Sequence, residues 1–133
     1  RPGLDVELPR ELVDRVAAHP VDPRRPEIVT QALNTMAQTL SDPLTIQDLA
    51  DALAQSTRRL EQLFAEHVGQ PPQRYYLHLR LTEAHRLATD SPMAVRDIAF
   101  ATGFTSLASF SRAFRAQFGL SVSSLRLGGQ NEN

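Results

Sequence analysis

The chain has 133 residues, of which 41% are hydrophobic and 6% aromatic, and its formal net charge is −1. This composition suits one domain or two very small ones, packed mainly through aliphatic side chains. The absence of cysteine excludes disulfides, thiolate metal sites and cysteine nucleophiles, and it fits a cytoplasmic protein. No stretch is long and apolar enough to cross a membrane, so no membrane partner is expected.

The first 26 residues are expected to form an N-terminal extension or interdomain linker. Prolines recur through this segment, and the stretch from Pro20 to Pro26 has the composition of a linker. Helical spacing allows one short amphipathic helix on Leu8, Leu12, Val13, Val16 and Ala17. The chain starts with Arg1 rather than Met and has no signal-peptide core. We therefore expect a piece of a longer protein, with a processed small protein as the alternative.

From Glu27 the apolar residues follow helical spacing, and a domain is expected over residues 27–127. The first helix is expected to end at Ser41-Asp42-Pro43. Thr45 and Ser56 are expected to cap the next two helices, and Gly69 ends the second of these before Pro71-Pro72. The predicted apolar stripes are Ile28, Ala32, Leu33, Met36 and Leu40, then Ile46, Leu49, Ala50 and Leu53, then Leu60, Leu63, Phe64 and Val68.

A longer helix is predicted over residues 73–88, before a break at Asp90-Ser91-Pro92. Two further helices follow, the last opened by Ser106 and closed by Gly119, and residues 128–133 are expected to be a tail. The apolar stripes of these helices are Tyr76, Leu77, Leu81, Ala84, Leu87 and Ala88, then Val95, Ile98 and Ala99, then Phe110, Ala113, Phe114 and Phe118. No β-type alternation persists anywhere, so the predicted fold is all-α.

One pattern occurs twice in this chain. Four residues recur at an offset of 49, Ile46, Asp48, Leu49 and Ala50 matching Val95, Asp97, Ile98 and Ala99. Four more recur at an offset of 50, Ser56, Leu60, Phe64 and Gly69 matching Ser106, Phe110, Phe114 and Gly119. The extra residue falls where a turn is expected, and turns absorb insertions. Gly103 suits a positive φ in the second turn, whereas Ala54 stands near the same place in the first.

A helix, a short turn and a Ser-capped helix are typical of a helix-turn-helix, whose second helix enters the DNA major groove. The residues outside the apolar stripes of the second helices are Thr57, Arg58, Glu61 and Gln62, then Leu107, Ala108, Ser111, Arg112 and Arg115. No acidic residue occurs between Asp97 and Glu132, so the second unit is locally positive. Repeated helix pairs also mediate protein contacts, and spacing alone leaves both functions open.

Several runs are more specific than this spacing. Asp97-Ile98-Ala99, Gly103-Phe104-Thr105-Ser106, Phe110-Ser111-Arg112-Ala113-Phe114-Arg115 and Phe118-Gly119 closely resemble the signature of the AraC/XylS family of transcription regulators. Upstream residues agree with it, namely Leu49-Ala50, Ser56, Leu60, Phe64, Gly69, Pro72, Tyr75 and Arg80-Leu81. The resemblance runs from Leu44 to Arg126, nearly all of the expected globular part.

The resemblance implies a homeodomain-like, seven-helix domain in which a linker helix, here residues 73–88, joins two helix-turn-helix subdomains at 44–69 and 93–119. Both recognition helices would then enter successive major-groove segments about 34 Å apart. By position, Arg58, Glu61 and Gln62 face bases in the first groove, and Ser111 and Arg112 in the second, with Leu107 and Ala108 close by. Arg112 is the foremost base-reading candidate because Arg bonds guanine O6 and N7 bidentately, and a phosphate contact is the alternative.

Phosphate contacts are expected from Arg59, Arg74 and Arg115, with a solvated side chain as the alternative for each. Ser56 and Ser106 are expected to cap the recognition helices, whose N-terminal amides also suit phosphate. Structural roles are expected for Arg80, Asp48 and Asp97.

Two features depart from the family pattern. Ser121-Val122 and Leu125-Arg126 stand where the family usually has Ser-Pro and a Tyr before the last Arg, so a looser last helix is expected. Glu61 is acidic where a base contact is expected. It either accepts from a cytosine amine or repels phosphate.

Two runs, Leu60-Glu61-Gln62-Leu63-Phe64 and Arg74-Tyr75-Tyr76-Leu77, resemble the subgroup with an N-terminal class I amidotransferase-like (PfpI-like) sensor domain. The chain holds no such domain. The expected partners are therefore double-stranded promoter DNA, RNA polymerase and a missing sensor or dimerisation domain, and an activator is expected. The alternative is a helical protein-interaction module that contacts RNA polymerase or a partner regulator.

No enzymatic function, cofactor or metal is expected. His78 and His85 are seven residues apart and can share a helix face, but two ligands without a third do not make a metal site. No Gly-rich phosphate loop and no nucleophile elbow occurs in the sequence.

Overall fold

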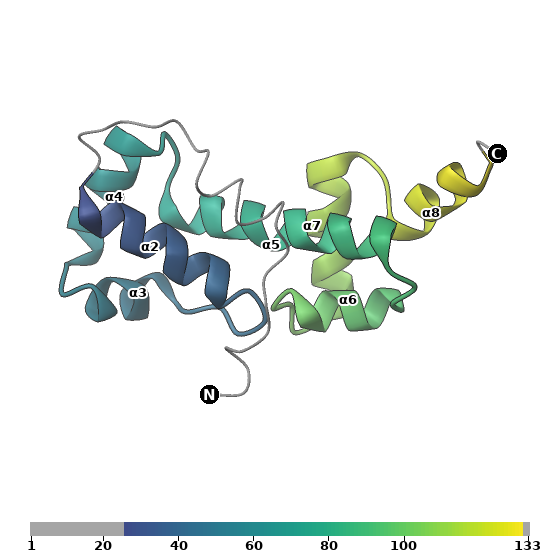
Figure 1. Ribbon diagram of the computed structural model, residues 1–133, viewed down its shortest axis with the longest axis horizontal. Coiled ribbons are helices and arrows are strands. Elements are labelled where there is room, and N and C mark those ends of the chain that lie inside the picture. The colour runs from purple at the N-terminus through teal and green to yellow at the C-terminus, as the bar shows by residue number, and fades with distance from the viewer. Residues whose placement is uncertain (1–25, 132–133) are drawn as a thin grey trace. The chain divides into compact units, whose positions relative to one another are not determined.

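The computed structural model describes the backbone of residues 26–131, so residues 1–25 of the expected linker, with its short helix, lie outside the described residues. The described residues form seven helices and no strand, which confirms the all-α prediction for them (Figure 1). Numbered as in Figure 1, the helices are α2 (Glu27–Gln38), α3 (Ile46–Ala52), α4 (Thr57–His67), α5 (Pro72–Asp90), α6 (Val95–Ala101), α7 (Leu107–Phe118) and α8 (Val122–Asn131).

The described residues divide into two compact units. Unit 1 comprises residues 26–39 and 43–79, with α2, α3, α4 and the first part of α5. Unit 2 comprises residues 40–42 and 80–131, with the second part of α5 and α6 to α8. Each unit therefore contains one of the two repeats seen in the sequence.

In unit 1, α4 packs against both α2 and α3. The buried side chains of these helices are Val29, Ala32, Leu33, Met36 and Ala37 of α2, Leu49 and Ala50 of α3, and Leu60, Leu63 and Phe64 of α4. Most predicted stripe residues are among them, but Ile28 is partly exposed and Val29 is buried in its place. The predicted face of α2 is therefore confirmed at Ala32, Leu33 and Met36, and it differs from the prediction only in the first turn of the helix.

Tyr76 of α5 ties the connection between α2 and α3 to the core of unit 1. Its ring is buried, and its hydroxyl accepts a hydrogen bond from the Leu44 backbone N–H at 2.9 Å. The same hydroxyl contacts the Thr39 hydroxyl and donates to the Thr39 carbonyl at 3.3 Å. A buried phenol is stable only with such partners, because an unsatisfied hydroxyl loses its hydration on burial.

The core of unit 2 is rich in aromatic rings, unlike the aliphatic packing predicted from the overall composition. The rings of Phe104, Phe110, Phe114 and Phe118 form a chain with successive centroids 5.3, 5.5 and 4.7 Å apart. The His85 ring of α5 lies 4.7 Å from the Phe118 ring. Four of the six phenylalanines of this sequence lie in this chain of rings, so composition averaged over the chain did not predict the packing of this unit.

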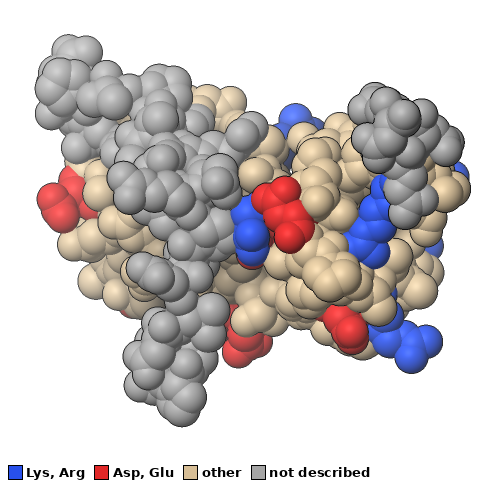
Figure 2. Space-filling view, turned by 45° about the vertical axis from the view of Figure 1, so that its right-hand side comes forward, with Lys and Arg blue, Asp and Glu red and all other residues tan. Residues whose placement is uncertain are grey.

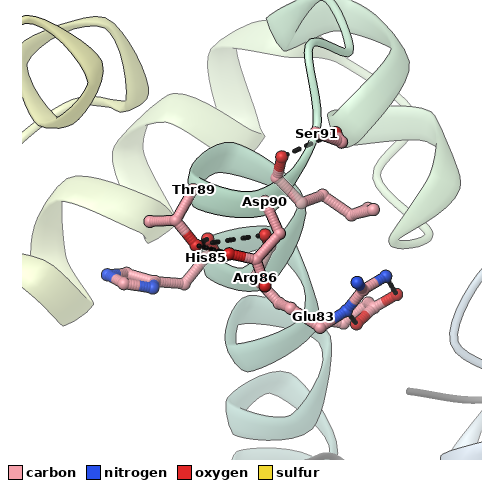
Figure 3. Close-up of polar contacts among 7 residues, drawn as sticks. Glu83, His85, Arg86, Thr89, Asp90 and Ser91 are labelled. Atoms are coloured by element: carbon pink, nitrogen blue, oxygen red, sulfur yellow. Dashed lines mark hydrogen bonds and ion pairs between the residues drawn. The ribbon is translucent and has the colours of Figure 1, made fainter. Parts of the chain in front are cut away.

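The long helix α5 extends beyond its predicted range at both ends. It begins at Pro72, because proline fits the first helical turn, where its missing N–H has no helical partner. At its other end the Ser91 hydroxyl donates to the Leu87 carbonyl at 2.7 Å, and the Thr89 hydroxyl donates to the His85 carbonyl at 3.2 Å (Figure 3). The Leu87 carbonyl also accepts from the Ser91 backbone N–H at 3.1 Å, so the hydroxyls add second hydrogen bonds to carbonyl groups in the last turns of the helix.

The last helix α8 is capped at its start and bonded to the end of α5. The Ser121 hydroxyl caps it by accepting from the Ser124 N–H at 3.0 Å, and Val122 is buried. Arg126 donates from Nε to the Ala88 carbonyl and from Nη2 to the Ser91 carbonyl, both at 3.0 Å. These bonds tie α8 to the end of α5, although Val122 and Leu125 depart from the family pattern. The helix continues to Asn131, four residues into the segment that was expected to be a tail.

Candidate nucleic-acid interface

The turns before α4 and α7 have the same backbone hydrogen bonds. Three N–H groups close each turn, and their partners recur 49 residues further along the chain. In unit 1 they are Leu53 to Leu49 (3.2 Å), Ala54 to Asp51 (3.0 Å) and Gln55 to Ala50 (2.9 Å). In unit 2 they are Thr102 to Ile98 (3.1 Å), Gly103 to Phe100 (3.1 Å) and Phe104 to Ala99 (2.9 Å). The two backbones therefore run in register through Gln55 and Phe104.

Both predicted serine caps are confirmed. Ser56 Oγ accepts from the Arg59 N–H at 3.0 Å, and Ser106 Oγ accepts from the Ser109 N–H at 3.1 Å. These caps lie 50 residues apart, whereas the turn bonds lie 49 apart. The single extra residue of the second unit is therefore Thr105, an exposed residue between Phe104 and the cap. From the caps onward α4 and α7 share one register, which places Leu107 at the position of Thr57.

Each turn also contains one residue with a left-handed backbone. Gly103 has φ +87°, as its sequence position predicted, and Ala54 has φ +57° in the equivalent place. This conformation is strained for alanine but not for glycine, because the Cβ atom of alanine lies close to the following carbonyl oxygen. Unit 1 therefore makes the same turn at a conformational cost.

Arg80 of α5 clamps the turn of unit 2. Its Nε donates to the Thr102 carbonyl at 2.8 Å, and its Nη2 donates to the Gly103 carbonyl at 2.9 Å. The guanidinium carbon lies 4.2 Å from the centroid of the Phe104 ring. The structural role expected for Arg80 is thus confirmed. Its donors satisfy the carbonyl groups that end α6, so the entry into α7 is held by a side chain from another helix.

The outer face of α4 carries the residues that the sequence assigned to the first recognition helix. Leu60, Leu63 and Phe64 are buried, and the opposite side is exposed. Thr57 is half-buried, while the exposed residues are Arg58, Arg59, Glu61 and Gln62. Arg74 lies apart from this face, exposed in the first turn of α5.

The outer face of α7 is exposed in the same way, with Phe110 and Phe114 buried behind it. All residues that the sequence assigned to this helix and its cap are exposed, namely Ser106, Leu107, Ala108, Ser111, Arg112 and Arg115. Leu107, the one large apolar side chain of this group, keeps 41% of its surface in solvent. The structure thus brings this predicted group together at the surface.

The nine arginines of the described residues fall into two groups. Three are bonded to the protein itself: Arg80, Arg126, and Arg86, whose guanidinium forms two bonds of 2.8 and 3.1 Å with the Glu83 carboxylate (Figure 3). The other six are exposed, and no ion pair or hydrogen bond joins their side chains to other described residues: Arg58, Arg59, Arg74, Arg96, Arg112 and Arg115. This second group is available to a polyanion.

Arg96 is the one member of that group which the sequence did not single out. It lies in the first turn of α6, beside Asp97. The sequence analysis named no residue of this helix as a DNA contact, although Arg96 stands 49 residues after the uncharged Gln47 and so distinguishes the two repeats. Asp97 and its counterpart Asp48 are exposed carboxylates in first helical turns, where they complement the helix dipole.

The charged residues do not merge into one basic surface on the face that Figure 2 shows. Blue arginines and red carboxylates are scattered there over a mostly uncharged surface. Among the described residues, no helix is long and apolar enough to span a membrane. Nor do these residues include a cluster of three side chains of the kinds that hold a metal ion.

Comparison with known sequences identifies the family. A family model described as a helix-turn-helix domain matches residues 49–127. The HTH-type transcriptional regulator CdhR of Pseudomonas aeruginosa is 36% identical over 95 residues, which cover 71% of this chain and 28% of that protein. The HTH-type transcriptional activator RhaS of Escherichia fergusonii is 41% identical over 80 residues, which cover 60% of this chain and 29% of that protein. The chain thus spans less than a third of the length of these curated relatives.

Solved structures agree with this assignment. A transcriptional regulator with an AraC-type DNA-binding domain from Chromobacterium violaceum superposes with a TM-score of 0.70 at 33% identity, covering 75% of this chain and 89% of that one. The DNA-binding domain of AdpA, solved in complex with a target DNA, gives 0.70 at 26% identity, covering 80% and 93%. The chain therefore belongs to the AraC-type helix-turn-helix family and carries the DNA-binding domain of a transcription regulator.

Proposed function

We propose that this domain reads two successive major-groove segments of double-stranded promoter DNA, one with α4 and one with α7. The observation that carries the proposal is the shared register of the two units. The same turn bonds and the same serine caps present one exposed helix face in each. A recognition helix needs this arrangement, since its buried side fixes it to the domain while its exposed side meets base edges.

In unit 2, we assign base contacts to Ser111 and Arg112 and a phosphate contact to Arg115. Arg112 is exposed and unpaired among the described residues, so both guanidinium edges are free to bond O6 and N7 of a guanine. The exposed Ser106 caps α7 by bonding the Ser109 N–H. Other backbone N–H groups at the N-terminus of this helix suit a phosphate. Arg96, in the first turn of α6, is a further phosphate contact, because the first helix of the motif crosses the DNA backbone.

In unit 1, we assign base contacts to Arg58, Glu61 and Gln62, with Thr57 beside them. Glu61 has no counterpart in α7, where Ser111 holds the same position, and a carboxylate suits the amine of a cytosine. Arg59 and Arg74 are exposed and are assigned to phosphates. The two helices therefore carry different contacting groups, and the two half-sites differ in sequence.

Selection of bound sequences from a random double-stranded pool, using this chain, tests the proposal. Two half-sites one helical turn apart, about 10 base pairs centre to centre, are expected. The logarithm of the binding constant is expected to fall with the logarithm of salt concentration by about 0.9 per phosphate contact. A flat salt response, or a pool that never enriches, contradicts the proposal.

Two arginine variants separate the assigned roles. Arg112→Ala is expected to cost about 1–3 kcal/mol and to relax selection at one base pair. Arg96→Ala is expected to weaken all sequences alike and to reduce the salt slope by about one contact. If Arg112→Ala lowers affinity equally for every sequence, Arg112 contacts a phosphate instead.

We further propose an activating role in the cytoplasm, with RNA polymerase as a second partner and a binding rather than catalytic function. The relative RhaS is named a transcriptional activator, which supports the activating role. The exposed carboxylates Asp48 and Asp51 lie on α3, outside the recognition helix, and support a contact with a protein such as RNA polymerase. The greater length of the curated relatives supports a further sensor or dimerisation domain in the whole protein. Transcription from a template with the selected site and purified polymerase is expected to rise when the chain is added, and a fall indicates repression.

A further inference from the structure

The first turn of α7 presents an apolar surface where the first turn of α4 presents a charged one. Leu107 is exposed at 41% of its surface, and Ala108 beside it is exposed as well. Leu107 is one of only three large hydrophobic residues that are exposed among the described residues, with Phe100 and Leu127. At the same register positions α4 carries Thr57, which is half-buried, and Arg58. The apolar end is therefore a property of α7 and not of the shared helix-turn-helix geometry.

This apolar end continues directly into polar side chains. Ser111 follows Leu107 by four residues, and Arg112 follows Ala108 by four, so each pair lies on one line along the helix surface. All four side chains are exposed. The face of α7 is thus apolar at its N-terminal turn, and in the next turn it becomes cationic and able to form hydrogen bonds.

The major groove offers partners for both kinds of surface. Thymine is the base whose major-groove edge carries a methyl group, and guanine presents two acceptors that match an Arg fork. The N-terminal residues of a recognition helix are those that reach base edges. An exposed Leu gains by covering a methyl group, whereas a polar edge at that point would be dehydrated without a hydrogen-bond partner.

We propose that Leu107, with Ala108, reads thymine through its 5-methyl group in the half-site of α7. This inference rests on the proposed function and adds to it the identity of a base. It assigns a specificity-determining role to a residue that makes no hydrogen bond with its side chain. It also separates the half-sites chemically, because α4 has no exposed apolar side chain at the equivalent positions.

The test replaces single thymines of the selected DNA site with deoxyuridine, which removes the methyl group and leaves the base-pairing edge unchanged. The half-site of α7 is the one in which Arg112→Ala relaxes selection. At a thymine within it, deoxyuridine is expected to lower the affinity of the chain about threefold to fivefold, the effect of returning one methyl group to water. Leu107→Ala is expected to bind the thymine site more weakly and to show a thymine-to-uracil affinity ratio near one.

Leu127→Ala is the matched control, since Leu127 is also an exposed leucine (57%) but lies on α8. It is expected to keep the full thymine-to-uracil ratio. Thermal unfolding followed by circular dichroism checks that both variants fold. Uracil ratios near one at every thymine for the unaltered chain, or an undiminished ratio in Leu107→Ala, overturn this inference alone. A chain that enriches no DNA overturns the proposed function as well.

Discussion

Units 1 and 2 build the same turn with different side chains. Unit 2 places Gly103 at its left-handed position and fastens the turn with Arg80, whose guanidinium binds two carbonyl groups and covers the Phe104 ring. Unit 1 has Ala54 at the same position, and the side-chain amide of Gln55 donates from Nε2 to the Leu53 carbonyl at 3.4 Å. The backbone plan thus depends on the hydrogen bonds and caps, while the side chains that support it are free to differ.

The surfaces of the units differ more than their backbones. The described residues of unit 1 include more carboxylates than arginines, with Glu27, Asp48, Asp51, Glu61 and Glu66 against Arg58, Arg59 and Arg74. Unit 2 has more arginines than carboxylates, with Arg80, Arg86, Arg96, Arg112, Arg115 and Arg126 against Asp42, Glu83, Asp90 and Asp97. Three of these arginines are bonded within unit 2, so each unit exposes three unpaired arginines. The excess of carboxylates in unit 1 therefore weakens its attraction for DNA relative to unit 2.

The largest expected effect compares the two cores. Phe64 and Phe114 hold equivalent positions in α4 and α7 and are both fully buried. Replacing either with Ala is expected to cost about 3–5 kcal/mol of unfolding free energy, because a cavity remains. Phe114→Ala is expected to cost about 1 kcal/mol more, since Phe114 also contacts the rings of Phe110 and Phe118. Urea denaturation of both variants measures the difference. A larger loss for Phe64→Ala would show that the ring contacts of Phe114 add nothing to the stability of unit 2.

The next effect concerns the clamp. Arg80→Ala is expected to cost about 2–4 kcal/mol, because two carbonyl groups lose a charged donor and the Phe104 ring loses its cation. Arg80→Lys keeps the charge but not the forked donors, so it is expected to recover only a fraction of that loss. Gln31→Ala, on the exposed surface of α2, is the control and is expected to change stability by less than about 0.5 kcal/mol. A loss of that small size for Arg80→Ala would show that the turn holds without its clamp.

Local features of this fold were predictable from the sequence. The caps at Thr45, Ser56 and Ser106 depend on bonds to an amide three residues away, which a short stretch of sequence reveals. The bonds of Arg80 and Arg126 reach carbonyls 22 to 38 residues away, and only the folded chain shows them. Tyr75 and Leu79 are buried although they lie outside the predicted stripe of α5, because this helix is covered on more than one side. A single-stripe pattern does not describe such a helix.

The exposed residues of the candidate interface were predictable, because they are the residues of α4 and α7 that lie outside the apolar stripes. Every assigned residue of α7 is exposed, and of the assigned residues of α4 only Thr57 is half-buried. Arg96 was missed because the candidate residues of unit 2 were taken from its second helix, and Arg96 lies on the first. Which exposed residues touch bases and which touch phosphates depends on the position of DNA, so these roles stay predictions.

A smaller effect tests whether the two caps are equivalent. Ser56→Ala and Ser106→Ala are each expected to cost about 1 kcal/mol, because the amide of Arg59 or Ser109 loses its acceptor. Asp at either position keeps an acceptor for that amide and is expected to preserve most of the stability. Thermal unfolding of the four variants measures these costs. Unequal costs for the two serines would show that the shared register conceals a difference at the helix entry.

The smallest effect exchanges the left-handed residues of the two turns. Ala54→Gly is expected to stabilise unit 1 by about 0.5 kcal/mol, because relief of the left-handed strain exceeds the greater chain entropy of glycine in the unfolded state. Gly103→Ala is expected to destabilise unit 2 by about 1 kcal/mol for the opposite reason. Urea denaturation of both variants measures the signs. The two stability changes are expected to have opposite signs, because the two turns share one backbone conformation and differ in the residue that adopts it. If Ala54→Gly destabilises the protein instead, the Ala54 methyl makes contacts that compensate for its strain, and unit 1 then has its own support for the turn in place of the Arg80 clamp.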